Sequence, residues 1–182
     1  MKPIHLIPLA NGNAAGPALN LLEGLAAALA RVFRTPCQIR PELLDVSFAL
    51  DSSRQQYYAT AILQRLERHC SPDARVLGVA SCDLFVPVLT FVFGEAQLDG
   101  NCAAVSLARL RDEAYGLPRR DDLLRERLLK EAVHELGHTF GLRHCADWRC
   151  VMTSSHAVER LDVKGVEFCA ACRRLVFAGT ER

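Results

Sequence analysis

The run HELGHTFGLRHC, from His134 to Cys145, constrains this chain more than any other stretch of its sequence. Residues four apart on a helix share a face, so His134 and His138 can direct both imidazoles at one point. Glycine adopts a positive φ without a clash and often follows a helix end, so Gly141 predicts a turn that brings His144 back under the helix. The spacing therefore predicts a metal site built from three histidines.

Glu135 supplies the further group that hydrolysis needs. It lies about 100° round the helix from His134, near water on the metal but not itself a ligand. Zinc held by three neutral imidazoles lowers the pKa of bound water to about 7, and a carboxylate can carry the proton from that water to a leaving amine. We predict His134, His138 and His144 as ligands of a catalytic zinc and Glu135 as its general base.

A second cluster of metal-type ligands follows directly. Two cysteine pairs stand about 20 residues apart near the end of the chain, within the range of structural zinc sites, where four thiolates close a tetrahedron. We expect a second, non-catalytic zinc here, with two disulfides or free thiols as the alternatives. Closing this site would also anchor the loop that carries His144. The four predicted ligands are Cys145, Cys150, Cys169 and Cys172.

The remaining cysteines, Cys37, Cys70, Cys82 and Cys102, stand alone in the sequence. Disulfide frameworks belong to small secreted chains, and 182 residues are enough to bury a core without them. We therefore expect these four to be buried thiols that pack as small hydrophobic side chains.

Strand and helix patterns alternate along the first part of the chain. Short apolar runs predict strands near residues 3–10, 37–46, 75–85, 89–97 and 101–110. Helical spacing predicts helices near 17–33 and 53–70, a third helix that Asp121 or Asp122 can cap, and a short final helix starting near Cys169. Strands in succession after alternating elements indicate an α+β fold with a mixed sheet, in a single domain over residues 1–182.

Charge and hydropathy exclude several classes of partner. The chain has 22 basic and 21 acidic residues, so it lacks the basic excess that nucleic-acid binding requires. No apolar run approaches the roughly 20 residues of a membrane span, and Pro and His interrupt the amino-terminal segment. We expect a soluble, cytoplasmic protein that binds neither nucleic acid nor a membrane.

These motifs together resemble the metzincin clan of zinc peptidases, whose signature H-E-x-x-H-x-x-G-x-x-H precedes a methionine turn. Within that clan the chain is similar to archaemetzincin, because a characteristic series follows the third histidine: Cys145, Cys150-Val-Met152 and Cys169-Ala-Ala-Cys172. The stretch CDLFVPVLTFVFGEAQLDGNCAAVSLARL extends the resemblance over most of the chain beyond residue 75.

The resemblance implies a fold and a set of roles. The fold would be a metzincin-like mixed, twisted sheet with an active-site helix, comprising an upper subdomain of about residues 1–141 and a small zinc-stapled lower subdomain of about 142–182. Met152 would lie beneath the catalytic zinc, and the second zinc would be structural. A peptide substrate would pair with an edge strand within residues 101–110. The activity would be zinc-dependent peptide hydrolysis, with the aminopeptidase type as the expected mode.

One departure from the clan concerns the group that stabilises the oxyanion. Some metzincins use a tyrosine after the methionine turn, whereas Tyr57, Tyr58 and Tyr115 all precede the motif here. His156 is a candidate substitute, with an ordinary exposed histidine as the alternative. The missing tyrosine supports a second hypothesis, a catalytically silent, zinc-organised module that binds a peptide or protein terminus uncut.

Two other side chains near the motif have two interpretations each. Glu131, one turn before His134, could orient that ring or form a surface ion pair with Arg127. Trp148, between two of the clustered cysteines, could line the cleft or cover the thiolate site.

Overall fold

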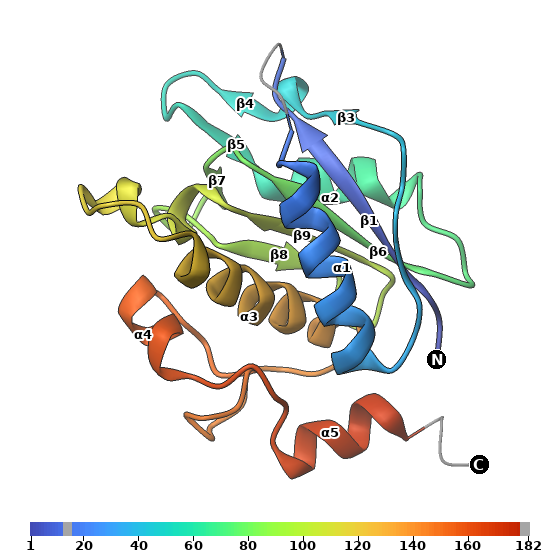
Figure 1. Cartoon of the computed structure of the whole chain (residues 1–182). Helices are drawn as coiled ribbons and strands as arrows, with labels where there is room; N and C mark the ends of the chain where they lie inside the picture. Colours follow the sequence, from blue (N-terminus) through green and yellow to red (C-terminus); the bar gives the residue numbers. More distant parts are fainter. Residues whose placement is uncertain (13–15, 179–182) are drawn as a thin grey trace.

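A mixed β-sheet forms the centre of the computed structural model, which describes residues 1–12 and 16–178 (Figure 1). Its strands lie in the order β2-β1-β6-β9-β8, with β3 pairing with the end of β1. The pairs are parallel except β8 with β9. This confirms the expected α+β fold with a mixed sheet. The strands are β1 Ile4–Ala10, β2 Cys37–Ile39, β3 Leu44–Asp45, β6 Arg75–Ala80, β8 Gly94–Ala96 and β9 Cys102–Ser106.

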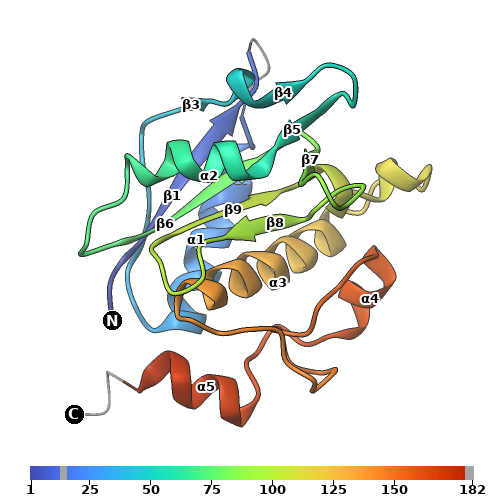
Figure 2. The ribbon, with the colours of Figure 1, turned by 180° about the vertical axis from the view of Figure 1, so that it is seen from behind.

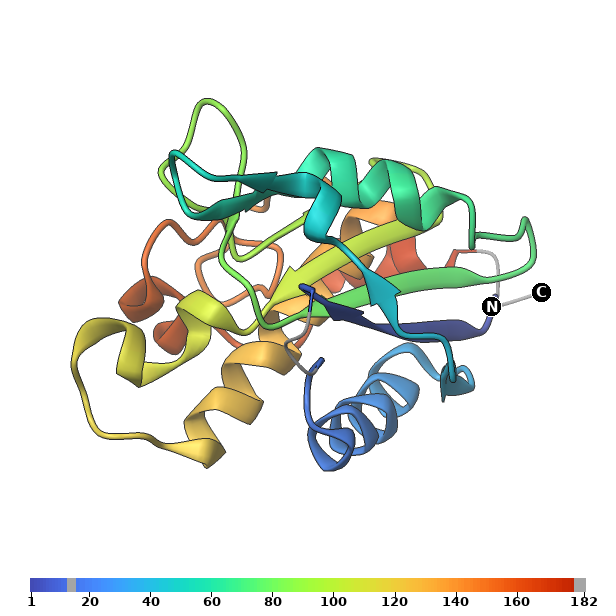
Figure 3. The same ribbon diagram turned by 90° about the horizontal axis from the view of Figure 1, so that it is seen from above.

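Helices cover both faces of this sheet (Figures 2 and 3). Helices α1 (Leu19–Phe33) and α3 (Asp121–Thr139) pack on one face, and α2 (Ala59–Glu67) packs on the other. Strands β6 and β9 therefore have helices on both sides, which explains why their segments VLGVA and CAAV are apolar and buried. The sheet and α3 provide the rigid frame on which the candidate site is built.

Smaller elements complete the fold. A second sheet joins β4 (Leu50–Asp51), β5 (Gln56–Tyr58) and β7 (Leu84–Phe85), and short 3-10 helices span Ser47–Ala49, Ala108–Leu110 and Asp112–Tyr115. Beyond α3 the chain passes beneath that helix and forms α4 (Val158–Val163) and α5 (Ala170–Phe177) (Figure 1). Among the helices of residues 1–12 and 16–178, none is long and apolar enough to cross a membrane.

The second predicted helix is shorter than its sequence pattern indicates. Residues 53–58 belong to a hairpin, because the Asp51 carboxylate accepts hydrogen bonds from the backbone N–H groups of Ser53 and Arg54 and closes a turn there. Gln55 adopts a positive φ of 54° in the same turn. The helix begins only at Ala59.

The predicted edge strand is wrong. Strand β9, within residues 101–110, lies between β6 and β8 and is paired on both sides. The edge of the sheet is β8, which the chain reaches before β9 and which turns back antiparallel to it. Any peptide that extends the sheet beside α3 would therefore pair with Gly94–Ala96.

Helix α3 begins without the predicted aspartate cap. Its cap residue is Arg120, which makes no side-chain capping bond, and Asp121 and Asp122 lie inside the first turn. Two carboxylates there still complement the positive end of the helix dipole. Asp121 itself pairs with Arg119 at 2.7 Å.

Two of the four isolated cysteines are not thiols. Cys70, after α2, and Cys102, at the start of β9, form a disulfide. Cys82 is a buried thiol as expected, whereas Cys37 is only half-buried. The two cysteines are 32 residues apart, and they meet only because α2 packs on the sheet. The local sequence therefore does not predict this disulfide.

Candidate active site

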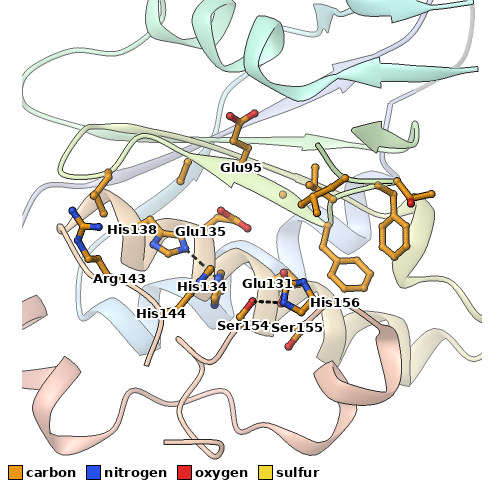
Figure 4. Close-up of a pocket in the computed structure, with 18 residues that line it drawn as sticks. Glu95, Glu131, His134, Glu135, His138, Arg143, His144, Ser154, Ser155 and His156 are labelled. Atoms are coloured by element: carbon orange, nitrogen blue, oxygen red, sulfur yellow. Dashed lines mark hydrogen bonds between the residues drawn. The ribbon is translucent and has the colours of Figure 1, made fainter. Parts of the chain in front are cut away.

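A cleft of about 700 Å³ runs between the edge strand and helix α3 (Figure 4). Strand β8 and the segment before it form its upper wall, α3 forms its back, and the segment after Met152 closes it from below. His134, Glu135, His138 and His144 all line this cleft.

The three predicted histidines converge in the cleft. One ring nitrogen from each lies within 4.8 Å of the others. His134 and His138 face each other across one helical turn with their Nε2 atoms 3.2 Å apart. Gly141 has a φ of 80°, which confirms the predicted turn and returns the chain so that the His144 ring lies 5.3 Å from that of His134.

Backbone carbonyls fix the orientation of both helix histidines. The Nδ1 atom of His134 lies 2.8 Å from the Val151 oxygen, and that of His138 lies 2.7 Å from the Leu142 oxygen. A carbonyl oxygen only accepts, so each Nδ1 carries the proton and each Nε2 presents a lone pair to the cleft. Burial lowers the pKa of all three histidines, which favours the neutral rings that metals bind.

Glu135 is buried beside the triad, with 5 % of its surface exposed. Burial raises its pKa well above the usual value, and the neighbouring carboxylates of Glu131 and Glu95 add to that rise. A carboxylate with a raised pKa holds a transferred proton better, which suits proton shuttling. A bound cation would oppose the rise and keep the group ionised between transfers.

Gly94 on the edge strand makes room for that carboxylate. A Cβ atom at this position would lie 2.5 Å from the Ala104 oxygen and 2.6 Å from Glu135 Cγ. Only glycine allows the strand to approach α3 this closely. Glu135 is thus held between the helix and the edge where a substrate would lie.

Gly137 plays a similar part on the lower side of α3. A Cβ atom here would collide with the Met152 sulfur and would lie 3.2 Å from Phe168. Met152 is completely buried, and the Val151 oxygen beside it is the acceptor for His134. The methionine turn therefore packs against the helix through a residue without a side chain.

A buried ion pair connects α3 to the segment that follows Met152. Lys164 donates to Glu131 at 2.9 Å and to the Thr153 oxygen at 3.2 Å, and it is 2 % exposed. Both interpretations of Glu131 from the sequence are therefore wrong, because it neither orients His134 nor pairs with Arg127. Arg127 instead bonds Asp112 and Asp162, and breaking either buried network would leave an uncompensated charge.

The four clustered cysteines form a second centre below α3. Their sulfur atoms lie within 4.8 Å of one another, and the Cys145 and Cys169 sulfurs are 3.8 Å apart. The Cys172 backbone N–H and other nearby donors lower the pKa of Cys169 to about 7, which favours the thiolate. Cys145 N–H donates to the Met152 oxygen at 3.0 Å, so the loop that carries His144 is fixed to the methionine turn.

His156 and Trp148 have different positions relative to the cleft. His156 lines it on the side opposite Arg143, with its Nε2 3.3 Å from the Ser154 hydroxyl oxygen (Figure 4). Its role as an oxyanion donor stays a prediction. Trp148 does not line the cleft and is 57 % exposed, so the first of its two interpretations is wrong.

Comparison with known proteins decides the family. The model of Peptidase family M54 matches residues 37–177, which carry all seven predicted ligands and Glu135. The chain belongs to this family.

The relatives of this M54 member agree in sequence and in fold. An archaemetzincin of Methanocaldococcus jannaschii is 45% identical over 136 residues, which are 75% of this chain and 74% of the relative. The crystal structure of archaemetzincin from Archaeoglobus fulgidus is 37% identical with a TM-score of 0.80, covering 95% of this chain and 99% of the relative. A zinc-dependent peptidase from Methanocorpusculum labreanum is 29% identical with a TM-score of 0.83 over the same shares.

These findings confirm the resemblance to archaemetzincin and the expected enzyme class, a zinc metallopeptidase. The structure also brings together each set of residues that the motif predicted. Sequence reasoning missed Gly94, Gly137 and Lys164. The two glycines interrupt a strand and a helix, which is a recognisable signal of close approach. Nothing local in the sequence marks Lys164.

Proposed function

We propose that this M54 member hydrolyses peptide bonds with one catalytic zinc ion held by His134, His138 and His144, and with Glu135 as general base. The observation that carries the proposal is the convergence of three ring nitrogens beside a buried carboxylate, in a cleft bounded by a free sheet edge. We further propose a structural zinc at Cys145, Cys150, Cys169 and Cys172, which makes two zinc ions per chain.

The spacing of the donor atoms supports zinc at both centres. Two nitrogens on a tetrahedral zinc lie about 3.3 Å apart and two sulfurs about 3.8 Å apart, from usual bond lengths of about 2.05 and 2.3 Å. The nitrogens of His134 and His138 are 3.2 Å apart, and the sulfurs of Cys145 and Cys169 are 3.8 Å apart. Three imidazoles leave a position for water, whereas four thiolates leave none. The first centre therefore suits catalysis and the second suits a structural role.

The protein groups then have distinct tasks. A substrate strand pairs with β8 and presents its scissile carbonyl to the histidine centre. Zinc held by the three histidines would supply a Lewis acid that polarises the carbonyl and lowers the pKa of water. Glu135 takes a proton from the attacking water and passes it to the leaving amine. The His134 ring is kept fixed during turnover by its hydrogen bond to the Val151 oxygen. The Leu142 oxygen does the same for His138.

Metal analysis and a peptide digest test this function together. We expect about two zinc ions per chain by elemental analysis, cleavage of members of an unbiased peptide library read by mass spectrometry, and loss of that cleavage after chelation. Adding zinc back should restore it. Cleavage that survives complete removal of the histidine-bound metal would contradict the proposal.

The same digest separates two modes of action and a rival function. Acetylated and free amino termini distinguish the aminopeptidase mode, which requires a free terminus, from internal cleavage. Intact peptides that co-purify with a zinc-loaded but hydrolytically silent protein would favour the binding module. A cytoplasmic location, the absence of nucleic-acid partners and the division into upper and lower subdomains near residue 141 stay predictions.

A Gly94→Ala variant should lower kcat/KM by about 10- to 100-fold, because the added methyl group must displace Glu135 or the edge strand. Steady-state kinetics on a peptide from the digest measure this. Gly24→Ala is the matched control, since a Cβ there meets nothing within 4 Å and alanine favours the helix interior. Equal kinetics in the two variants would show that β8 does not set the position of Glu135.

A further inference from the structure

The edge strand offers its backbone to a partner at two residues. In the antiparallel pair of β8 and β9, Phe93 accepts from Ser106 at 2.8 Å and Gln97 donates to Cys102 at 3.0 Å. Backbone groups alternate in direction along a strand, so residues 93, 95 and 97 face β9. Gly94 and Ala96 therefore direct their N–H and C=O groups to the open edge.

The cleft also has a direction. Gly94 lies against Glu135, and further along the chain the Asp99 N–H donates to the His138 oxygen at 2.9 Å. Strand β8 therefore runs along α3 in the same sense, from Glu135 towards His138. An antiparallel peptide, which pairs slightly more stably than a parallel one, would run the other way. Its amino-terminal side would lie near His138 and its carboxyl-terminal side near Phe93.

Arg143 lies at the end of the cleft that would receive the amino-terminal side. It precedes His144, it is exposed, and its side chain rises beside His138 towards the edge of the sheet (Figure 4). Within residues 1–12 and 16–178, no ion pair includes Arg143. Its guanidinium group is therefore available to a ligand.

Two of the three carboxylates that line the cleft have other partners. Glu95 accepts a hydrogen bond from Thr60 at 2.8 Å and points away from the histidines, and Glu131 is held by Lys164. The opposite end is apolar, where Phe91 and Phe93 stack edge to face with ring centres 5.3 Å apart. Among the described residues that line the cleft, Arg143 is the only lysine or arginine. Arg109, which lies over the Phe91 ring from outside, is paired with Asp83.

We propose that the cleft prefers peptides with an acidic side chain on the amino-terminal side of the scissile bond, and that Arg143 binds this carboxylate. The inference rests on the proposed peptidase function for the direction of the chain relative to the cleaved bond. A guanidinium group is suited to this task because its planar fork matches a carboxylate and stays charged at any working pH.

Two assays with the same peptides test the preference. A peptide cleaved by the enzyme is made with glutamate, glutamine or lysine at each position before and after the scissile bond. We expect glutamate before the bond to raise kcat/KM about two- to fivefold over glutamine, the range that an exposed charge pair gives. Binding of the same labelled peptides to the zinc-loaded Glu135→Gln variant, measured by fluorescence anisotropy, should show a similar ratio of Kd values.

Variants of Arg143 assign the effect to this residue. Arg143→Ala should remove the preference, Arg143→Glu should transfer it to lysine, and Arg174→Ala, an exposed arginine on α5 outside the cleft, should leave it unchanged. A preference that survives Arg143→Ala, or one for glutamate after the bond, overturns the proposal. So does equal binding of all three peptides. If no peptide is cut, the proposed peptidase function fails. The glutamate, glutamine and lysine substitutions are then made in a library peptide that binds the protein. Anisotropy with these peptides still decides whether Arg143 binds an acidic side chain.

Discussion

A Glu135→Gln variant should lose peptide hydrolysis by about 10²- to 10⁴-fold while keeping its zinc. Glutamine has nearly the same shape and fits between Gly94 and α3, but it cannot take a proton from water. The loss should appear in kcat, because the amide removes proton transfer and leaves the cleft intact. Steady-state kinetics with elemental analysis of the same sample measure both quantities.

A matched control isolates the base from general effects of removing a carboxylate. Glu23→Gln changes an exposed residue on α1, away from the cleft, and should leave both kinetics and zinc content unaltered. Full activity in the Glu135 variant would remove this residue from the mechanism. Loss of zinc together with activity would instead assign Glu135 to the metal site.

Cys172→Ser should remove one zinc ion per chain and lower Tm by about 10 °C or more. Structural zinc contributes of order 10 kcal/mol in small zinc modules, and each kcal/mol is worth roughly 2–4 °C in a chain of this size. Cys172 is buried at the start of α5, so the loss should also release that helix. Elemental analysis and thermal unfolding measure the two effects.

The isolated Cys37 provides the comparison for this variant. It is a half-buried thiol outside both clusters, so Cys37→Ser should change Tm only slightly and keep the full zinc content. Activity should fall in the Cys172 variant as well, because Cys145 follows His144 directly in the chain. Unchanged zinc content and Tm in Cys172→Ser would contradict a structural metal at the four cysteines.

The helix α3 and the histidine site on it could be predicted because their geometry is local. His134 and His138 are placed by helix periodicity alone, and Gly141 is placed by its freedom to adopt a positive φ. Only His144 needed the chain to return from outside the helix. That return follows directly from the turn at Gly141. The twelve residues from His134 to Cys145 were therefore enough to predict most of the histidine site.

The parts that could not be predicted depend on contacts between distant segments. The order of strands decides which one is the edge, and an apolar strand with partners on both sides has the same pattern as an apolar edge strand. The partner of Glu131 is Lys164, 33 residues later, and the bond between Cys70 and Cys102 likewise joins separate elements. In each case the local sequence offered a plausible nearer partner or none.

The packing of Gly137 against Met152 makes substitutions at these two positions depend on each other. A larger residue at 137 has space only if the side chain at 152 becomes shorter, and without that change it would press on the turn whose Val151 oxygen holds His134. A shorter side chain at 152 alone would leave a cavity against Gly137. Substitutions at the two sites should thus be acceptable mainly as compensating pairs, so that across descendants of this sequence the glycine and the methionine are expected to be inherited together.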